Sequence, residues 1–125
     1  MTEQVGAYKA TLTAVEGTTP GGALSLANPE GVDLIITRLI LDITTEATGA
    51  ATVEAGIAAN GTTSSDNLID AGNVGAAVTV LDNIDNQGTN GQSVVKWGSS
   101  QYLTITASAT LAGLVGNAYI EYKRV

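Results

Sequence analysis

The sequence predicts an all-β fold, and three features support that class. The β-branched residues Val, Ile and Thr are abundant, and they suit a pleated, half-buried strand better than a helix. Segments of alternating apolar and polar side chains recur along the chain, and clusters of Gly, Asn and Asp separate them. A chain of 125 residues can form one domain with a buried core. We therefore expect a single-domain antiparallel β-sandwich of about eight strands that covers residues 1–125.

The first two strands are expected in the N-terminal quarter of the chain. Residues 5–15 alternate in character and stop at a breaker loop rich in Gly, with one Pro, over residues 17–22. Residues 23–27 place Leu24 and Leu26 on one face, and the turn at residues 28–31 ends this second strand.

Residues 32–45 form the strongest strand candidate, although a buried helix is the competing interpretation. β-branched residues and a clean period of two favour the strand. One parity is expected to face the core and consists of Ile35, Thr37, Leu39, Leu41 and Ile43. The other parity is mixed in character and consists of Leu34, Ile36, Arg38, Ile40 and Asp42. We expect a protein partner or a neighbouring loop to cover this mixed face.

The rest of the chain predicts five further strands and two loops. The strand candidates cover residues 51–59, 74–81, 93–97, 101–109 and 118–125. Residues 62–71 are expected to form a loop with one helical turn, capped at Ser64 or Ser65. Residues 82–91 form a polar loop of ten residues. Short strands at this spacing, separated by polar turns, are typical of a sandwich or barrel of the jelly-roll kind.

The absence of His and Cys excludes several kinds of chemistry. Catalysis by Ser-His-Asp or Cys-His groups, zinc held by thiolate or imidazole, haem ligation and disulfide bonds all need these residues. The Gly-containing segments 17–22 and 113–116 match neither a Walker loop nor the GxGxxG pattern of dinucleotide sites. We therefore expect neither an enzyme nor a bound cofactor.

Charge and hydropathy limit the partners. Five basic and 12 acidic residues give a formal net charge of −7, which opposes binding to a phosphate backbone. No apolar run is long enough for a membrane-spanning helix. The segment Met1–Gln4 lacks the positive charge and apolar stretch of a secretion signal. We expect no nucleic acid and no membrane partner, and synthesis in the cytoplasm without export.

Two groups of polar residues are candidates for a ligand site. The loop residues Asp82, Asn83, Asp85, Asn86 and Asn90 offer oxygen ligands for calcium, but their spacing does not match an EF-hand, and Asx residues are also typical of turns. The residues Asp66 and Asp70 resemble a carboxylate pair of glycosidase type, for which capping and solvation are the simpler roles. We favour the structural interpretation in both cases.

Four aromatic residues define an alternative function, which is carbohydrate binding. Exposed aromatic rings in a β-sandwich can stack on sugars, and the candidates are Trp97, Tyr102, Tyr119 and Tyr122. The opposing interpretation is that Trp97 anchors the core or a subunit contact. Parity favours the core for Tyr122, which shares a face with Ile120.

Four segments carry a likeness to a known family, namely residues 39–58, DNLIDAG at 66–72, DNIDNQGTNG at 82–91 and GLVGNAYIEY at 113–122. They resemble small structural proteins of tailed bacteriophages, chiefly capsid decoration or head-fibre proteins of β-sandwich build. The resemblance implies a jelly-roll-like domain, often trimeric, that is seated on the major capsid protein at the exterior of the virion. It carries over no catalytic residues.

The expected function is therefore that of a homo-oligomeric capsid decoration protein that stabilises the shell. The candidate oligomer or capsid interface consists of Leu34, Ile36, Arg38, Ile40, Asp42 and Trp97. The N-terminal residues 1–8 are a candidate contact arm, and the loop tips at residues 18–22 and 82–91 are further candidates.

Overall fold

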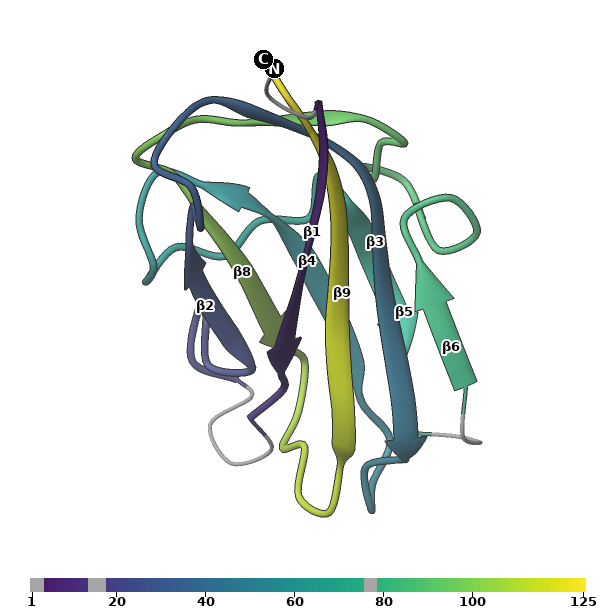
Figure 1. The fold of residues 1–125 in the computed structure, drawn as a ribbon. Coiled ribbons are helices and arrows are strands. Elements are labelled where there is room, and N and C mark those ends of the chain that lie inside the picture. Colours follow the sequence, from purple (N-terminus) through teal and green to yellow (C-terminus); the bar gives the residue numbers. More distant parts are fainter. Residues whose placement is uncertain (1–3, 14–17, 76–78) are drawn as a thin grey trace.

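The computed structural model describes residues 4–13, 18–75 and 79–125, which form two antiparallel sheets that pack face to face (Figure 1). Sheet A has the order β1 (Val5–Thr11), β9 (Val115–Arg124), β3 (Leu34–Thr45) and β6 (Thr79–Asp82), and β7 (Val95–Trp97) also pairs with β3. Sheet B has the order β2 (Leu24–Ala27), β8 (Tyr102–Ala107), β4 (Thr52–Ala58) and β5 (Ile69–Asn73). These nine strands, with no helix among the described residues, confirm the predicted all-β sandwich.

The core lies between the sheets and is mostly aliphatic. In β8 the alternation of side chains places Leu103 and Ile105 inside, and in β9 it does the same for Ala118 and Ile120. Trp97 is the largest of the fully buried side chains. Across the described residues, no helix is long and apolar enough to cross a membrane.

The long strand β3 changes the face that it buries. Leu34 and Ile36 point into the core near its start, whereas Leu39 and the alternate residues up to Ile43 do so near its end. The pairing with β9 shifts between Ile36 and Arg38, which marks a β-bulge. Since one extra residue reverses the parity of everything that follows, the expectation of a single inward parity along this strand is wrong.

The region before β6 also differs from the expectation. Residues 62–68 form turns and irregular backbone in place of a helical turn, and β5 begins at Ile69. The side-chain amide of Asn67 accepts a hydrogen bond from the Ile57 N–H at 2.9 Å and donates one to the Ile57 carbonyl at 3.4 Å. This amide therefore pairs with β4 much as a strand residue would. The strand predicted over residues 74–81 is present only from Thr79, and residues 76–78 lie outside the described residues.

The two sheet orders bring together strands that are far apart in the sequence. The first strand β1 pairs with the last strand β9, and β2 pairs with β8. Consecutive strands often change sheet, as from β1 to β2, from β2 to β3 and from β3 to β4. The jelly-roll connectivity stays a prediction, with which these strand orders are compatible.

The β3 edge of sheet A is completed by three pieces of chain. β6 pairs with the second half of β3, and β7 pairs with its first three residues. Between them the buried Asn83 exchanges hydrogen bonds with Leu39, donating its N–H at 3.1 Å and accepting the Leu39 N–H on its Oδ1 at 2.8 Å. Its Nδ2 donates to the carbonyls of Gln92 and Ser93. Asn83 therefore joins the loop over residues 83–94 to the edge of the sheet.

Candidate functional site

The basic residues of the chain all lie on the strands of one sheet. The chain has five Lys and Arg residues, and every one belongs to a strand of sheet A, namely Lys9 in β1, Arg38 in β3, Lys96 in β7, and Lys123 and Arg124 in β9. Sheet B carries carboxylates without any basic residue. The two faces of the sandwich therefore differ in charge, and each offers different chemistry to a partner.

The outer face of sheet A carries charged side chains in weak, solvated contacts. Arg38 lies 3.8 Å from the Asp82 carboxylate, and Lys96 lies 3.4 Å from that of Asp33. The ammonium of Lys9 lies over the ring of Tyr119, at 5.7 Å from its centroid. Such exposed pairs contribute little to stability, so these groups remain available to a partner.

A groove of about 250 Å³ lies where β1 meets β9. Its lining residues come from three consecutive positions in each strand and are Ala7, Tyr8, Lys9, Tyr119, Ile120 and Glu121. Alternation along the strands directs four of these six to the outer face, which leaves the small Ala7 between longer neighbours. This groove is open, and it borders the edge of sheet A.

The expected interface residues divide into two groups. Leu34, Ile36 and Trp97 are 0% exposed, so their side chains contact no partner, and their assignment to an interface is corrected. The bulge in β3 turns Leu34 and Ile36 inward, and β7 places Trp97 in the core, where its Nε1 donates to the Gln101 carbonyl at 3.0 Å. The remaining three residues are partly exposed on the outer face of sheet A, and they are Arg38, Ile40 and Asp42.

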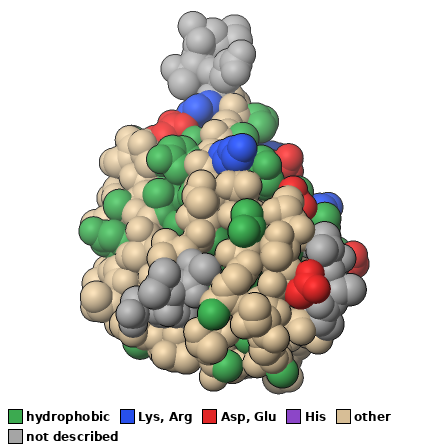
Figure 2. All heavy atoms as spheres, turned by 90° about the horizontal axis from the view of Figure 1, so that it is seen from below, with side chains coloured by type: hydrophobic (Ala, Val, Ile, Leu, Met, Phe, Trp, Pro, Cys, Tyr) green, Lys and Arg blue, Asp and Glu red, His purple; other side chains and the backbone are tan. Residues whose placement is uncertain are grey.

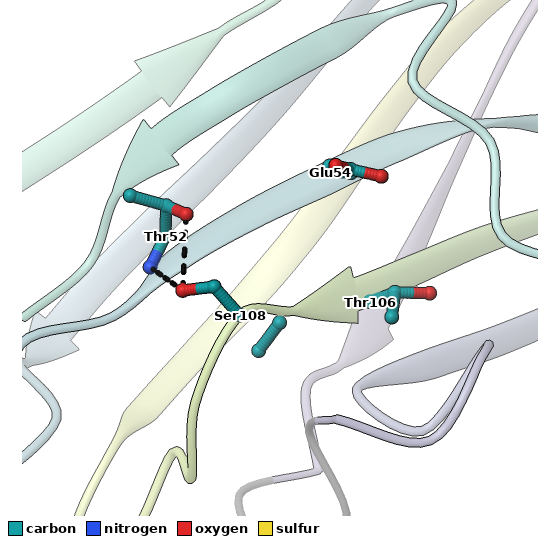
Figure 3. Close-up of a pocket in the computed structure, with 5 residues that line it drawn as sticks. Thr52, Glu54, Thr106 and Ser108 are labelled. Atoms are coloured by element: carbon teal, nitrogen blue, oxygen red, sulfur yellow. Dashed lines mark hydrogen bonds between the residues drawn. The ribbon is translucent and has the colours of Figure 1, made fainter.

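The outer face of sheet B has a small hollow of about 90 Å³ between β4 and β8 (Figure 3). At one end of it the Ser108 hydroxyl accepts hydrogen bonds from the Thr52 N–H at 2.9 Å and from the Thr52 hydroxyl at 3.1 Å. Glu54 and Thr106 line the other end, with Glu54 directed away from the Thr52–Ser108 pair in Figure 3. The hollow has room for only one or a few water molecules.

Three carboxylates gather beside this hollow. Glu54, Asp66 and Asp70 each offer an oxygen within 4.8 Å of the other two, a separation that could hold a hard cation. Two of the three already accept hydrogen bonds from the loop over residues 83–94. Asp70 Oδ2 accepts the N–H groups of Thr89 and Asn90 at 3.2 Å, and Asp66 Oδ2 accepts the Asn90 side-chain amide at 2.9 Å. Asp66 and Asp70 therefore anchor a distant loop, a structural role other than the capping and solvation that the sequence favoured.

The loop over residues 82–91 uses its Asx side chains on its own backbone. Asp82 Oδ1 accepts the N–H groups of Ile84 at 2.7 Å and Asp85 at 2.8 Å. The bond from Asp85 is the main cause that lowers the pKa of the Asp82 carboxyl. Asn86 Oδ1 in turn accepts the N–H of Asp82 at 3.1 Å. These contacts are turn chemistry, which was the favoured interpretation, and they occupy oxygens that a cation would need.

A hydrogen-bonded network joins the end of the chain to the loop after β2. Arg124 makes a bidentate contact with Glu30, with both distances at 2.7 Å, and the Tyr122 hydroxyl donates to the same carboxylate at 2.5 Å. The bonds from Arg124, followed by the one from Tyr122, lower the pKa of Glu30. Burial, followed by the bond to Glu30, raises the pKa of Tyr122. Sequence reasoning missed this network because 94 residues separate Arg124 from Glu30 and no local pattern links them.

The aromatic residues of the carbohydrate-binding alternative do not share a surface. Trp97 is 0% exposed and Tyr122 is 3% exposed, so neither ring can stack on a sugar. Tyr102 belongs to β8 in sheet B, whereas Tyr119 belongs to β9 in sheet A. The four aromatic residues therefore form no common platform.

One end of the sandwich is poor in charge. The loops over residues 46–51 and 109–114 lie at the lower end in Figure 1, and Figure 2 looks onto this end, where few charged side chains appear. In these two loops and the described residues 18–22, the one charged residue is Glu46. β1, which includes part of the expected contact arm, begins at the opposite end. The expected arm and the expected loop tip at residues 18–22 therefore lie far apart (Figure 1). Residues 1–3 of the expected arm, and residue 17 of the breaker loop, lie outside the described residues.

Neither a protein-family model nor a curated protein nor a solved structure matches the chain.

Proposed function

We propose that this protein is a structural component of a virion, namely a homo-oligomeric decoration protein that binds the major capsid protein on the head exterior. The observation that carries the proposal is that the polar side chains serve to hold the structure together. In the described chain, every buried side-chain nitrogen or oxygen has a hydrogen-bond partner. Among the described residues, the groups with a shifted pKa are Glu30, Asp82 and Tyr122, and all of them form hydrogen bonds in loops or at sheet ends. Hydrogen-bonded and ionised groups that stabilise the fold, rather than take part in a reaction, fit a protein that must remain assembled.

The composition and packing support the same proposal. Small side chains allow the two sheets to pack closely around an aliphatic core. The net charge of −7 keeps the free protein soluble at high copy number. The likeness of four segments to phage decoration proteins selects the virion among structural roles.

The charge-poor lower end is the capsid contact in this proposal. An interface core is depleted in charged residues, and this end has exposed small side chains such as Ala112 with one carboxylate, Glu46. The opposite end carries the Glu30–Arg124 network and the loop over residues 83–94, which is rich in polar side chains. A contact made through the lower end would leave that polar end in solvent.

Co-sedimentation with expanded, empty heads of the same virus tests the proposal. The wild-type protein should pellet with the heads, and Ala112→Asp should weaken binding by roughly tenfold or more, since it places a charge in the contact. Ser100→Asp is the matched control, because Ser100 is an exposed residue in the loop before β8, at the other end of the sandwich. A wild-type protein that stays in the supernatant overturns the function. Equal binding of both variants overturns the assignment of the lower end.

Carbohydrate binding is the alternative function, and it now depends on Tyr102 and Tyr119 alone. Because these residues lie on different sheets, each would have to bind sugar without the other. A glycan array probed with the wild type and with Tyr119→Ala decides this alternative. Binding that disappears in the variant would support it, and a blank array for the wild type would remove it.

A further inference from the structure

The strand β1 leaves one side of its backbone open along the edge of sheet A. It pairs with β9 through seven consecutive residues without a register shift, and in the described chain no strand pairs with its other side. The hydrogen bonds just beyond β1 show which backbone groups point toward β9 and which point to the open side. The Leu12 N–H donates to the Gly116 carbonyl toward β9, whereas the Thr13 N–H donates to the Ala23 carbonyl on the other side.

This alternation assigns the free groups of the strand. In an antiparallel pair, residues alternate between those that bond to the neighbour and those whose N–H and C=O point away. Even-numbered residues bond to β9, so the N–H and C=O groups of Ala7, Lys9 and Thr11 point outward from the sheet. The Val5 carbonyl belongs to the same set and accepts a bond from Arg124 Nη1 at 2.9 Å.

The edge carries few of the usual devices that prevent pairing with another chain. Natural edge strands are kept apart by charged side chains, especially Lys, and by bulges, prolines or a covering loop. β1 has no Pro and no bulge, and its one charged residue, Lys9, points to the outer face. Val5 is 62% exposed and Tyr8 is 41% exposed. The edge is therefore competent for strand addition.

We propose that β1 pairs with β1 of a second copy, antiparallel, about a two-fold axis at Tyr8. Mutual backbone hydrogen bonds must join residues whose groups point outward, so only odd-numbered residues can form the bonded pairs. A register centred on Lys9 would place two ammonium groups opposite one another, which is unfavourable. A register centred on Ala7 would leave Thr11 unpaired. The register centred on Tyr8 pairs Ala7 with the second copy's Lys9, and Val5 with its Thr11.

Charge complementarity across this contact supports the same register. Within each chain, Glu121 in β9 pairs with Arg38 in β3 on one side and with Ala7 in β1 on the other. The second copy's Lys9 would lie next to Ala7, within the groove that Glu121 also lines. Because Ala7 is small, that long side chain can reach across it toward the Glu121 carboxylate. The contact thus places a positive charge beside a negative one, twice, by symmetry.

Tyr8 occupies the centre of the contact. Its backbone bonds toward β9, so the two Tyr8 residues would form a pair without mutual backbone bonds, the type in which side chains approach most closely. The exposed parts of both rings would become buried against each other. The proposed contact therefore covers an exposed aromatic residue that the single chain leaves in solvent.

This inference goes beyond the proposed function, and it replaces the trimer that the resemblance favours. Two identical antiparallel strands are related by a two-fold axis, whereas a three-fold axis cannot place a strand against itself. The contact lies on the β1 edge of sheet A, away from Ala112 at the lower end. Self-association and head binding can therefore fail independently.

Light scattering on the purified full chain is the first test. The wild type should have twice the chain mass of 12.6 kDa. Ala7→Pro removes an outward N–H, which an edge strand tolerates, and it should weaken the dimer by roughly tenfold or more. Asn73→Ser, a change at the far edge strand of sheet B, is the control that should remain dimeric. A wild type that is monomeric at all soluble concentrations, or that is trimeric, overturns the proposal.

Cross-linking tests the register. The chain has no Cys, so Tyr8→Cys introduces a single thiol on the axis, and closely approached strand residues have the Cα separation that a disulfide needs. Oxidised Tyr8→Cys should form a covalent dimer, whereas Thr11→Cys should not, because the second copy's Val5 faces it. A covalent dimer from Thr11→Cys but not from Tyr8→Cys contradicts this register, as does a dimer that is unaffected by Ala7→Pro.

Discussion

The two edges of sheet A satisfy their backbone groups in opposite ways. At the β3 edge, β6 and β7 bond to the two ends of the strand, and the buried Asn83 bonds to Leu39 between them. At the β1 edge, the outward groups of Ala7, Lys9 and Thr11 have no strand beside them among the described residues.

The difference shows that the two edges of sheet A make different use of polar side chains. The β3 edge is irregular, with a bulge and an interrupted partner, and an amide side chain replaces the missing strand residue. The β1 edge is regular and needs no replacement within the chain. An irregular edge that the chain's own residues cover is protected from pairing with another chain. A regular edge with open backbone groups can pair with another chain.

The largest expected effect is at Asn83. Asn83→Ala removes the partners of the Leu39 N–H and of two loop carbonyls, and a buried group without a partner is costly. The free energy of unfolding should fall by about 3 kcal/mol. Urea unfolding followed by the fluorescence of Trp97, the single Trp of the chain and fully buried, measures it. Asn90→Ala, at an exposed position in the same loop, is the control, and an equal loss in both variants would contradict the special role of Asn83.

The next effect concerns the inner side of β1. A Cβ on Gly6 would lie 2.6 Å from the Cε1 atom of Tyr122, whose ring is buried and whose hydroxyl is bonded to Glu30. Because the ring cannot move away, Gly6→Ala should lower the free energy of unfolding by about 1–3 kcal/mol. The control is Gly49→Ala, where an added Cβ meets nothing within 4 Å. Equal midpoints in a urea titration would show that β1 can shift on β9.

A pH effect is expected at the end of sheet A where β1 begins. The lowered pKa of Glu30 means that the folded state holds its carboxylate ionised at pH values where the unfolded chain takes up a proton. The stabilisation is therefore complete above the ordinary Glu pKa of about 4.3 and is lost as pH falls through the lower folded value. Glu30→Gln should make the fall in unfolding free energy between about pH 5 and pH 3 shallower than in the wild type. Asp85→Asn, at an exposed position, serves as the control, and parallel curves for wild type and Glu30→Gln would contradict the prediction.

The smallest effect is expected at the ion pair beside Asn83. Arg38 is 41% exposed in its side chain and lies 3.8 Å from Asp82, so solvent screens the attraction. Arg38→Ala should change the free energy of unfolding by less than about 1 kcal/mol. The same titration on Lys96→Ala, which removes another exposed pair, provides the comparison. A loss at Arg38 as large as that at Asn83 would show that charge, rather than the buried amide, closes this edge.

Local alternation was enough to predict several strands. The segment around Leu103 and Ile105 and the final strand with Ile120 were predicted within a few residues, because each buries one face of a regular strand. The bulge in β3 was not predicted, since apolar residues occupy both parities of residues 34–43 and alternation therefore did not show where the inward parity changes. β5 was missed because Ile69 is followed by Asp70 and Gly72, a composition that is typical of loops.

The candidate sites were predicted less well than the strands. Asp66 and Asp70 were singled out, but Glu54 joins them only through the pairing of β4 with β5. Trp97 was left open between the core and a subunit contact, because a strand candidate as short as residues 93–97 has too few positions for its parity to decide which side is buried.

The sequence by itself determined the secondary-structure class, the aliphatic core and the absence of thiol and imidazole chemistry, because composition and nearest-neighbour alternation carry that information. The tertiary structure alone decided which face of β3 is buried, which carboxylates lie together and which edge is left open. Those features depend on register and on contacts between residues tens of positions apart, and a one-residue shift in pairing moves every later side chain to the other face.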